Sequence, residues 1–128
     1  MNRKAIVFGI LFLPAIFLQI NVWAQIEKQL IGSWKSENNY ELSVSFFKDK
    51  SGLYQGKIDD NKDSDFGKIV FKGMNYNDKT QTFSGILSPA KVNINLDATI
   101  SFINNNRIKV VGKKMFITKT VYFSRQKQ

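Results

Sequence analysis

The residues with the most obvious capacity for chemistry are four aspartates within a stretch of seven residues. Carboxylate oxygens are ligands that Ca²⁺ prefers, and Asp59, Asn61 and Asp63 have the alternating spacing of the first ligands of a calcium loop. Against this, the sixth position of such a loop is Ser64 rather than Gly, and the twelfth is Val70 rather than Glu. We therefore favour a solvated turn kept polar by Asp and Asn, with no metal, and keep a calcium site as the alternative.

The chain contains no cysteine and no histidine. This excludes disulfides, thiol nucleophiles, zinc sites built from those residues, every Ser-His or Cys-His relay, and a lipid anchor on a cysteine. Catalysis would need carboxylates, Lys, Tyr or Arg, and nothing in the sequence predicts the burial that tunes an aspartate for acid–base work. We therefore expect a protein that is not an enzyme, has no catalytic residues and needs no cofactor.

Basic residues outnumber acidic ones by 19 to 10 among 128 residues, a net charge of +9. If those on strands cluster, they would attract an anionic polymer or a membrane surface. The chain lacks the basic-aromatic motifs of nucleic-acid-binding folds, so no nucleic acid partner is expected. A solvated basic exterior is the favoured interpretation, and peripheral contact with the cell envelope stays open. The basic residues expected on the outer faces of strands are Lys57, Lys68, Lys72, Arg107, Lys109 and Lys113.

Residues 1–24 have the pattern of a secretory signal peptide. Arg3 and Lys4 precede an apolar run, and the three residues before Gln25 begin and end with small side chains. A membrane anchor is the alternative, but Pro14 interrupts a run that is already shorter than the ~20 residues of a spanning helix. Cleavage would remove two of the 19 basic residues and leave 17 against 10 acidic ones, a charge of +7. We expect a periplasmic or secreted mature protein.

The hydrophobic period beyond residue 31 is two, which is typical of strands that bury one face. A single domain over residues 25–128 is expected, with a short helical turn at residues 25–31 before the first strand. Eight strands in sequence with short loops predict an all-β, antiparallel, lipocalin-like up-and-down barrel. The expected strands are the one opening at Ser33 and those at 41–47, 53–58, 68–74, 81–87, 93–102, 107–113 and 115–124. The expected turns are 49–52, 59–67, 75–80, 104–106 and 112–114.

The predicted inner face of the barrel carries bulky apolar side chains. An eight-stranded barrel either fills with such side chains or holds one small ligand. A packed core is slightly favoured, and a cavity for a small apolar ligand is the alternative. The candidate residues lining that cavity are Phe46, Phe71, Phe83, Leu96 and Phe102.

Two strands share an aromatic-x-Gly-x-aliphatic pattern centred on Gly56 and Gly85. A glycine inside a strand usually marks a sharp bend or the close approach of another group. In a small barrel a missing side chain makes room for a neighbouring ring. We interpret both glycines as architectural rather than as ligand contacts.

Gly32 and Trp34 open the first predicted strand, and Arg125 ends the last. In a closed meander these strands are neighbours, so the indole and the guanidinium are predicted to stack and close the barrel. A Gly-x-Trp on the first strand with an arginine near the C-terminus resembles the pattern shared by lipocalin-like barrels.

From Gly32 to Arg125 the chain also resembles the bacterial exported family catalogued as domain of unknown function 2147. The resemblance rests on the segments Gly32-Ser33-Trp34, Gly56-Lys57-Ile58, Phe83 to Pro89, Lys109 to Gly112 and Phe123-Ser124-Arg125. It implies a lipocalin-type barrel and no established activity. The chain departs from the family pattern at Ser88, where an acidic residue is expected, and lacks the Asn-Pro pair of the long loop and the tyrosine expected after Pro89.

Three classes of function follow from these patterns. A binding module for a small apolar ligand is the first expectation, by analogy with the fold. A structural or interaction protein of the bacterial cell envelope, using its basic surface, is the alternative. An enzyme comes third.

Overall fold

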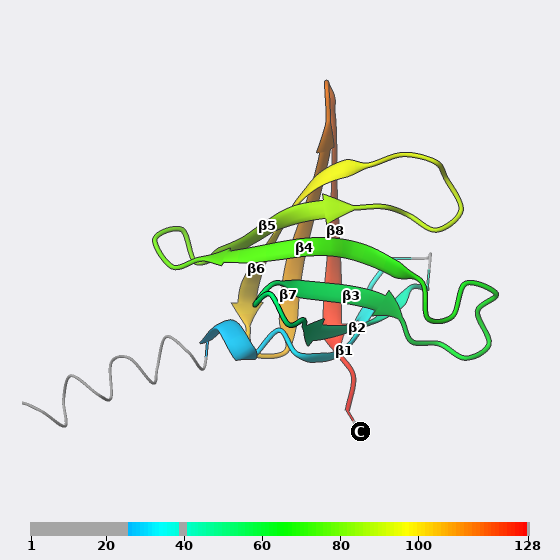
Figure 1. Ribbon diagram of the computed structural model, residues 1–128, viewed down its shortest axis with the longest axis horizontal. Helices are drawn as coiled ribbons and strands as arrows, with labels where there is room; N and C mark the ends of the chain where they lie inside the picture. Colours follow the sequence, from blue (N-terminus) through cyan, green and yellow to red (C-terminus); the bar gives the residue numbers. More distant parts are fainter. Residues whose placement is uncertain (1–25, 39–40, 128) are drawn as a thin grey trace, which may run out of the picture.

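The computed structural model of the chain describes residues 26–38 and 41–127, so the predicted signal peptide at residues 1–24 lies outside the described residues. Eight antiparallel strands follow one another around a closed barrel, and β8 pairs with β1 (Figure 1). The predicted all-β, lipocalin-like up-and-down barrel is therefore confirmed. The strands are β1 (Gly32–Ser36), β2 (Ser43–Lys48), β3 (Tyr54–Ile58), β4 (Ile69–Asn77), β5 (Thr82–Leu87), β6 (Leu96–Asn104), β7 (Arg107–Lys114) and β8 (Ile117–Arg125).

Helix in the described part of the chain is limited to one turn at residues 26–28. None of the helices among these residues is long and apolar enough to cross a membrane. The turn leads to Leu30, which is completely buried and packs with the core at one end of the barrel.

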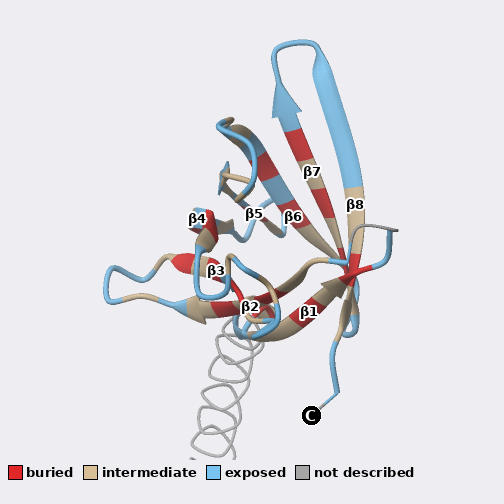
Figure 2. Cartoon of the chain, turned by 90° about the vertical axis from the view of Figure 1, so that its right-hand side faces the viewer, coloured by how far each residue is buried: buried red, intermediate tan, exposed pale blue. Residues whose placement is uncertain are grey.

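The core lies inside the barrel because most strands alternate between an inner apolar face and an outer polar face. β8 is the exception, since its first four residues are all exposed. In β6, for example, Ala98 and Ile100 are buried whereas Asp97 and Thr99 are exposed. Buried residues therefore recur in short bands along the strands (Figure 2). The largest completely buried side chains are Trp34, Tyr54, Phe46, Phe71 and Phe83.

The two strand glycines make room for neighbouring groups, as their pattern predicts. A Cβ at Gly56 would lie 2.9 Å from the Phe46 ring and 3.0 Å from Phe71. A Cβ at Gly85 would lie 2.7 Å from the Lys72 carbonyl oxygen and 2.6 Å from the Met74 sulfur. Both glycines therefore permit close packing inside the barrel.

Several predicted element boundaries are wrong, and β2 starts at Ser43 rather than at residue 41. Residues 75–77 continue β4 rather than forming a turn, because they pair with β5. The pairing is irregular between Lys72 and Asn75, where Gly73 has φ 61°, and it resumes at Asn75. Residues 93–95 lie in the β5–β6 loop, although their polarity alternates like that of a strand. The polarity alternates because Ile94 is half-buried and its two neighbours are exposed. These residues do not pair with β5, since the β5–β6 pairing begins at Leu96.

The predicted turn at residues 112–114 is also wrong, since these residues are the end of β7. Gly112 is buried, and a Cβ there would lie 3.3 Å from Leu96, so this glycine accommodates an inner side chain rather than a reversal of the chain. The reversal occurs at Met115 and Phe116, since Lys114 pairs with Ile117. The last strand therefore begins at Ile117 rather than at the predicted residue 115.

Candidate functional site

The side chains of Trp34 and Arg125 join the two ends of the chain. The guanidinium carbon lies 4.2 Å from the centroid of the Trp34 ring, and the two residues are partners in the β1–β8 register. Trp34 is completely buried, and its Nε1 donates to the carbonyl of Leu30 at 2.9 Å. A Cβ at Gly32 would lie 3.2 Å from Arg125 Nη1, so glycine leaves space for the guanidinium.

Arg125 also donates to carbonyl oxygens of two further segments, the residues just before β1 and the β6–β7 turn. Its Nε donates to Asn105 at 3.0 Å, its Nη1 to Ile31 at 3.3 Å, and its Nη2 to Gln29. Partial burial lowers the pKa of Arg125 from its ordinary value. These contacts engage all three guanidinium nitrogens within the chain, which supports the predicted role of Arg125 in barrel closure.

Arg107, which the sequence places on a basic exterior, is engaged in a second cluster beside this seam. Its guanidinium donates to both oxygens of Glu37 at 3.0–3.2 Å and lies 4.2 Å from the Tyr122 ring centroid. Hydrogen bonds from Arg107 and from the Ser124 hydroxyl lower the pKa of Glu37. Arg107 is therefore paired, and it is not a free cation for a ligand.

The aspartate-rich loop uses its carboxylates within the chain. Asp59 accepts from the Ser33 hydroxyl at 2.6 Å and from the Ser43 hydroxyl, which ties the loop to β1 and β2. Asp63 accepts from the Asp65 amide at 2.9 Å in a local turn, and Asn61 is exposed. Over residues 26–38 and 41–127, no three acidic side chains converge in a way that could hold a metal. Asp59 and Asp63 therefore accept hydrogen bonds from within the chain.

The candidate cavity residues pack against one another. The Phe46 and Phe71 ring centroids are 5.1 Å apart, and those of Phe83 and Phe102 are 6.0 Å apart. The ring centroids of Phe83 and Tyr54 are 5.3 Å apart. Leu96, at the start of β6, is half-buried. Edge-on and tilted contacts at these separations are those of a filled aromatic core.

One polar group in this core is without a hydrogen-bond partner among the described residues, the hydroxyl of Tyr54. Burial, followed by the nearby Glu27 carboxylate, raises its pKa. Glu27 forms an ion pair with Lys48 at 3.8 Å, and Lys48 Nζ lies 5.7 Å from the Tyr54 ring centroid. This end of the barrel is covered by the helical turn that carries Glu27.

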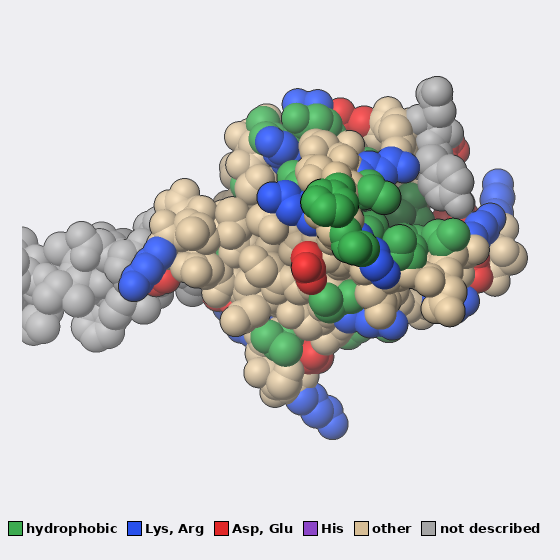
Figure 3. Space-filling model, turned by 90° about the horizontal axis from the view of Figure 1, so that it is seen from above, with side chains coloured by type: hydrophobic (Ala, Val, Ile, Leu, Met, Phe, Trp, Pro, Cys, Tyr) green, Lys and Arg blue, Asp and Glu red, His purple; other side chains and the backbone are tan. Residues whose placement is uncertain are grey.

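Basic side chains lie on several parts of the exterior. Viewed from above, lysine and arginine groups alternate with hydrophobic side chains over the surface (Figure 3). Lys57, Lys68, Lys72 and Lys113 are exposed, as predicted, whereas Arg107 and Lys109 are half-buried. The exterior is therefore basic, and three of its lysines line a groove.

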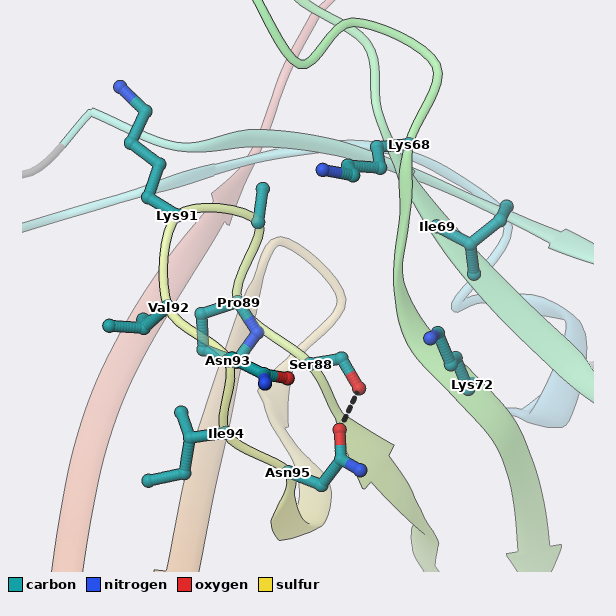
Figure 4. Close-up of a pocket in the computed structure, with 11 residues that line it drawn as sticks. Lys68, Ile69, Lys72, Ser88, Pro89, Lys91, Val92, Asn93, Ile94 and Asn95 are labelled. Atoms are coloured by element: carbon teal, nitrogen blue, oxygen red, sulfur yellow. Dashed lines mark hydrogen bonds between the residues drawn. The ribbon is translucent and has the colours of Figure 1, made fainter.

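This groove lies between β4 and the β5–β6 loop and has a volume of about 450 Å³. The start of β4 forms one wall, and the loop forms the facing wall (Figure 4). A hydrogen bond of 2.6 Å from the Ser88 hydroxyl to Asn95 Oδ1 joins the two ends of the loop. The eleven lining residues include three lysines and no acidic residue: Lys68, Ile69, Lys72, Ser88, Pro89, Ala90, Lys91, Val92, Asn93, Ile94 and Asn95.

Charge and apolar surface meet in the groove. Lys68 pairs with Asp65 at 3.6 Å, and among the described residues Lys72 and Lys91 have no ion-pair partner within 4 Å. Ile69, Pro89 and Ile94 supply apolar surface beside these cations. The arrangement can hold a small molecule with an anionic group and a short apolar part.

Sequence reasoning placed Lys68 and Lys72 on the exterior but missed the groove. It extended the strand back to Asn93, which hid the loop that forms the second wall. The available signal was Pro89, two residues after the end of β5, because proline cannot donate to a strand ladder and favours a loop.

Comparison with protein families, with curated proteins and with solved structures finds no match to this chain. The resemblance to the exported family of unknown function therefore stays a prediction. What the fold and the site define is a small closed antiparallel barrel with a filled core and a basic external groove.

Proposed function

We propose that this protein is a binding module, exported after removal of residues 1–24, whose external groove holds a small amphipathic anion. The observation that carries the proposal is the lining of the groove, which combines three lysines with apolar side chains and contains no carboxylate. A volume of about 450 Å³ lies within the usual range of small-molecule sites, roughly 300–1,000 Å³.

The position of this groove modifies the expectation of an apolar ligand inside the barrel. Phe46, Phe71 and Phe83 are at most 1% exposed and contact other aromatic rings, so a ligand there would have to displace packed side chains. Forcing extra atoms into a well-packed core typically costs about 1–3 kcal/mol of stability per site. The groove requires no such displacement.

Binding rather than catalysis is favoured by the groups that line the groove. The one hydroxyl side chain in the lining, that of Ser88, donates to the amide oxygen of Asn95. An amide is not a proton acceptor of the strength that activates a serine, which needs an adjacent general base. The lysines act as point charges for an anion.

The test compares octyl phosphate with octanol, which share an apolar chain and differ in charge. We expect octyl phosphate to bind more tightly, with amide chemical-shift changes at Lys72, Ser88 and residues 90–95. Lys72→Gln and Lys91→Gln should each weaken its binding about two- to fivefold, the effect of one exposed ion pair. Lys79→Gln, on the exposed turn between β4 and β5, is the matched control and should leave affinity unchanged.

If octanol binds as tightly as octyl phosphate and the shift changes occur at Phe46, Phe71 and Phe83, the groove is not the binding site. The ligand would then bind inside the barrel. An equal effect of Lys79→Gln would show attraction by net charge alone.

A further inference from the structure

The outer end of the β7–β8 hairpin holds three consecutive apolar side chains in solvent. Met115, Phe116 and Ile117 have exposed fractions of 89%, 98% and 65%. β6 pairs with β7 only as far as Lys113, so the end of the hairpin lies beyond the neighbouring strand. The hairpin extends past the rest of the barrel (Figure 1), and its end is exposed along both strands (Figure 2).

The requirements of the turn do not explain these residues. Two-residue hairpin turns favour Asn, Asp and Gly because they need left-handed backbone conformations. Here Met115 has φ 54°, which is uncommon for a residue with a long side chain and carries strain. Since neither the turn nor the core requires apolar side chains at Met115 and Phe116, their character points to a contact outside the chain.

Lysines stand directly behind the apolar residues. Lys113, Lys114 and Lys119 are exposed, and none of the three has an ion-pair partner within 4 Å in the described part of the chain. After Asp97 the sequence contains seven basic residues and no acidic one. Figure 3 views the molecule from the side of the hairpin end and shows hydrophobic side chains in front with basic groups on several sides.

We propose that the tip of the β7–β8 hairpin, Met115–Ile117 with its three lysines, docks on a lipid bilayer that contains anionic headgroups. Apolar side chains at the end of a narrow hairpin can enter the boundary between headgroups and acyl chains, and lysines behind them can reach the headgroups. A stable protein partner needs roughly 800 Å² on each side, which a two-residue turn does not provide. The site is separate from the groove and stands independently of the proposed ligand.

The first experiment places a reporter at the tip. The parent protein and its variants are purified from one exporting host, so that all carry the same N-terminus. Phe116→Trp should show a blue-shifted emission with vesicles of phosphatidylcholine and phosphatidylglycerol, and quenching by brominated acyl chains. Phe66→Trp is the matched control, because Phe66 is also an exposed loop phenylalanine, 58% exposed, away from this hairpin. It should show no additional quenching.

The second experiment measures vesicle partitioning of unlabelled protein. Phe116→Ser should weaken binding at least tenfold, from the loss of one inserted aromatic side chain. Replacing Lys113, Lys114 and Lys119 together by Gln should weaken it about a hundredfold on anionic vesicles, about fivefold for each charge. The thermal midpoints of these variants should stay close to that of the parent, because all four side chains are exposed.

Three results would overturn the proposal. The first is equal quenching at positions 66 and 116, or none at either. The second is a concentration-dependent dimer that disappears in Phe116→Ser, which would assign the tip to a second copy of the chain. The third is a combined result: polyphosphate binds through the lysines, and Phe116→Ser leaves vesicle binding unchanged. That result would assign the hairpin to an anionic polymer.

Discussion

Replacing Arg125 by alanine removes a guanidinium that holds together the first strand, the last strand and two loops. The change deletes the stacking contact with Trp34, whose expected contribution is about 0.5–2 kcal/mol. It also removes the charged donor from three carbonyl groups, those of Gln29, Ile31 and Asn105. Water can replace the donor at the surface, so we count the three hydrogen bonds together as a single bond to a charged group, about 1.5 kcal/mol. Arg125→Ala should therefore lower the free energy of unfolding by about 2–3.5 kcal/mol.

Trp34→Ala should cost more, about 3–5 kcal/mol, because a large buried aromatic leaves a cavity in the core. Trp34→Leu fills part of that space and suits a double-mutant cycle with Arg125→Ala. If the two side chains stabilise each other, the cycle should give an interaction energy of about 0.5–2 kcal/mol. Lys119→Ala, on the exposed hairpin, is the control partner and should be additive with Trp34→Leu.

Urea unfolding followed by far-UV circular dichroism is the appropriate assay. Tryptophan fluorescence is unsuitable, since Trp34 is the only tryptophan after residue 24 and is itself replaced. Strict additivity of Trp34→Leu and Arg125→Ala would refute the stacked closure. A loss at Arg125 below about 0.5 kcal/mol would show that water replaces the guanidinium at all three carbonyls.

Three further predictions concern packing, pH and processing. Gly56→Ala and Gly85→Ala should each lower the free energy of unfolding by about 1–3 kcal/mol. Gly85→Ala should have the larger effect, since two of the nearest neighbours of Gly85 are backbone carbonyl oxygens. Urea titration tests this, with Ser84→Ala at an exposed position as the control. Hydrogen bonds from Ser51 and Gln55 lower the pKa of Asp49 from 3.8 to about 2, so the carboxylate stabilises the fold above the higher value and this contribution is lost as pH falls toward the lower. The stability difference between parent and Asp49→Asn should therefore shrink over that window, and a constant difference would contradict the assignment. Intact mass from an exporting host should match a chain that begins at Gln25, whereas a full-length membrane-bound product would exclude cleavage.

The fold could be predicted because its main determinant is local and periodic. Alternation along the strands specifies which side chains face inward, and strand order follows from short connections. The pairing of Trp34 with Arg125 required only that the first and last strands meet. Side chains whose partners lie far away in the chain were not predictable in the same way. The pairing of Arg107 with Glu37 depends on contacts across 70 residues that no local pattern records.

Asn105 and Asn106 illustrate a turn whose position was predicted but whose conformation was not. Asparagine tolerates left-handed conformations, yet among the described residues the only non-glycine residues with positive φ are Gln81 and Met115. The turn is stabilised instead by the Asn104 side chain, whose Oδ1 accepts from the Asn106 amide at 2.8 Å. Asparagine suits both conformations, so its presence locates a turn without specifying the backbone.

Two of the places where local rules fail are also the places to which we assign contacts with other molecules. Residues 93–95 alternate like a strand but form the wall of a groove, and Met115-Phe116 occupies a turn that small polar residues would form with less strain. In a sequence whose strand pattern, core and closure agree with one another, a local conflict needs a cause outside the fold. Replacing Met115-Phe116 by Asn-Gly separates the two requirements: it should raise the free energy of unfolding and abolish vesicle binding. A variant that is less stable than the parent would show that the apolar turn serves the fold itself.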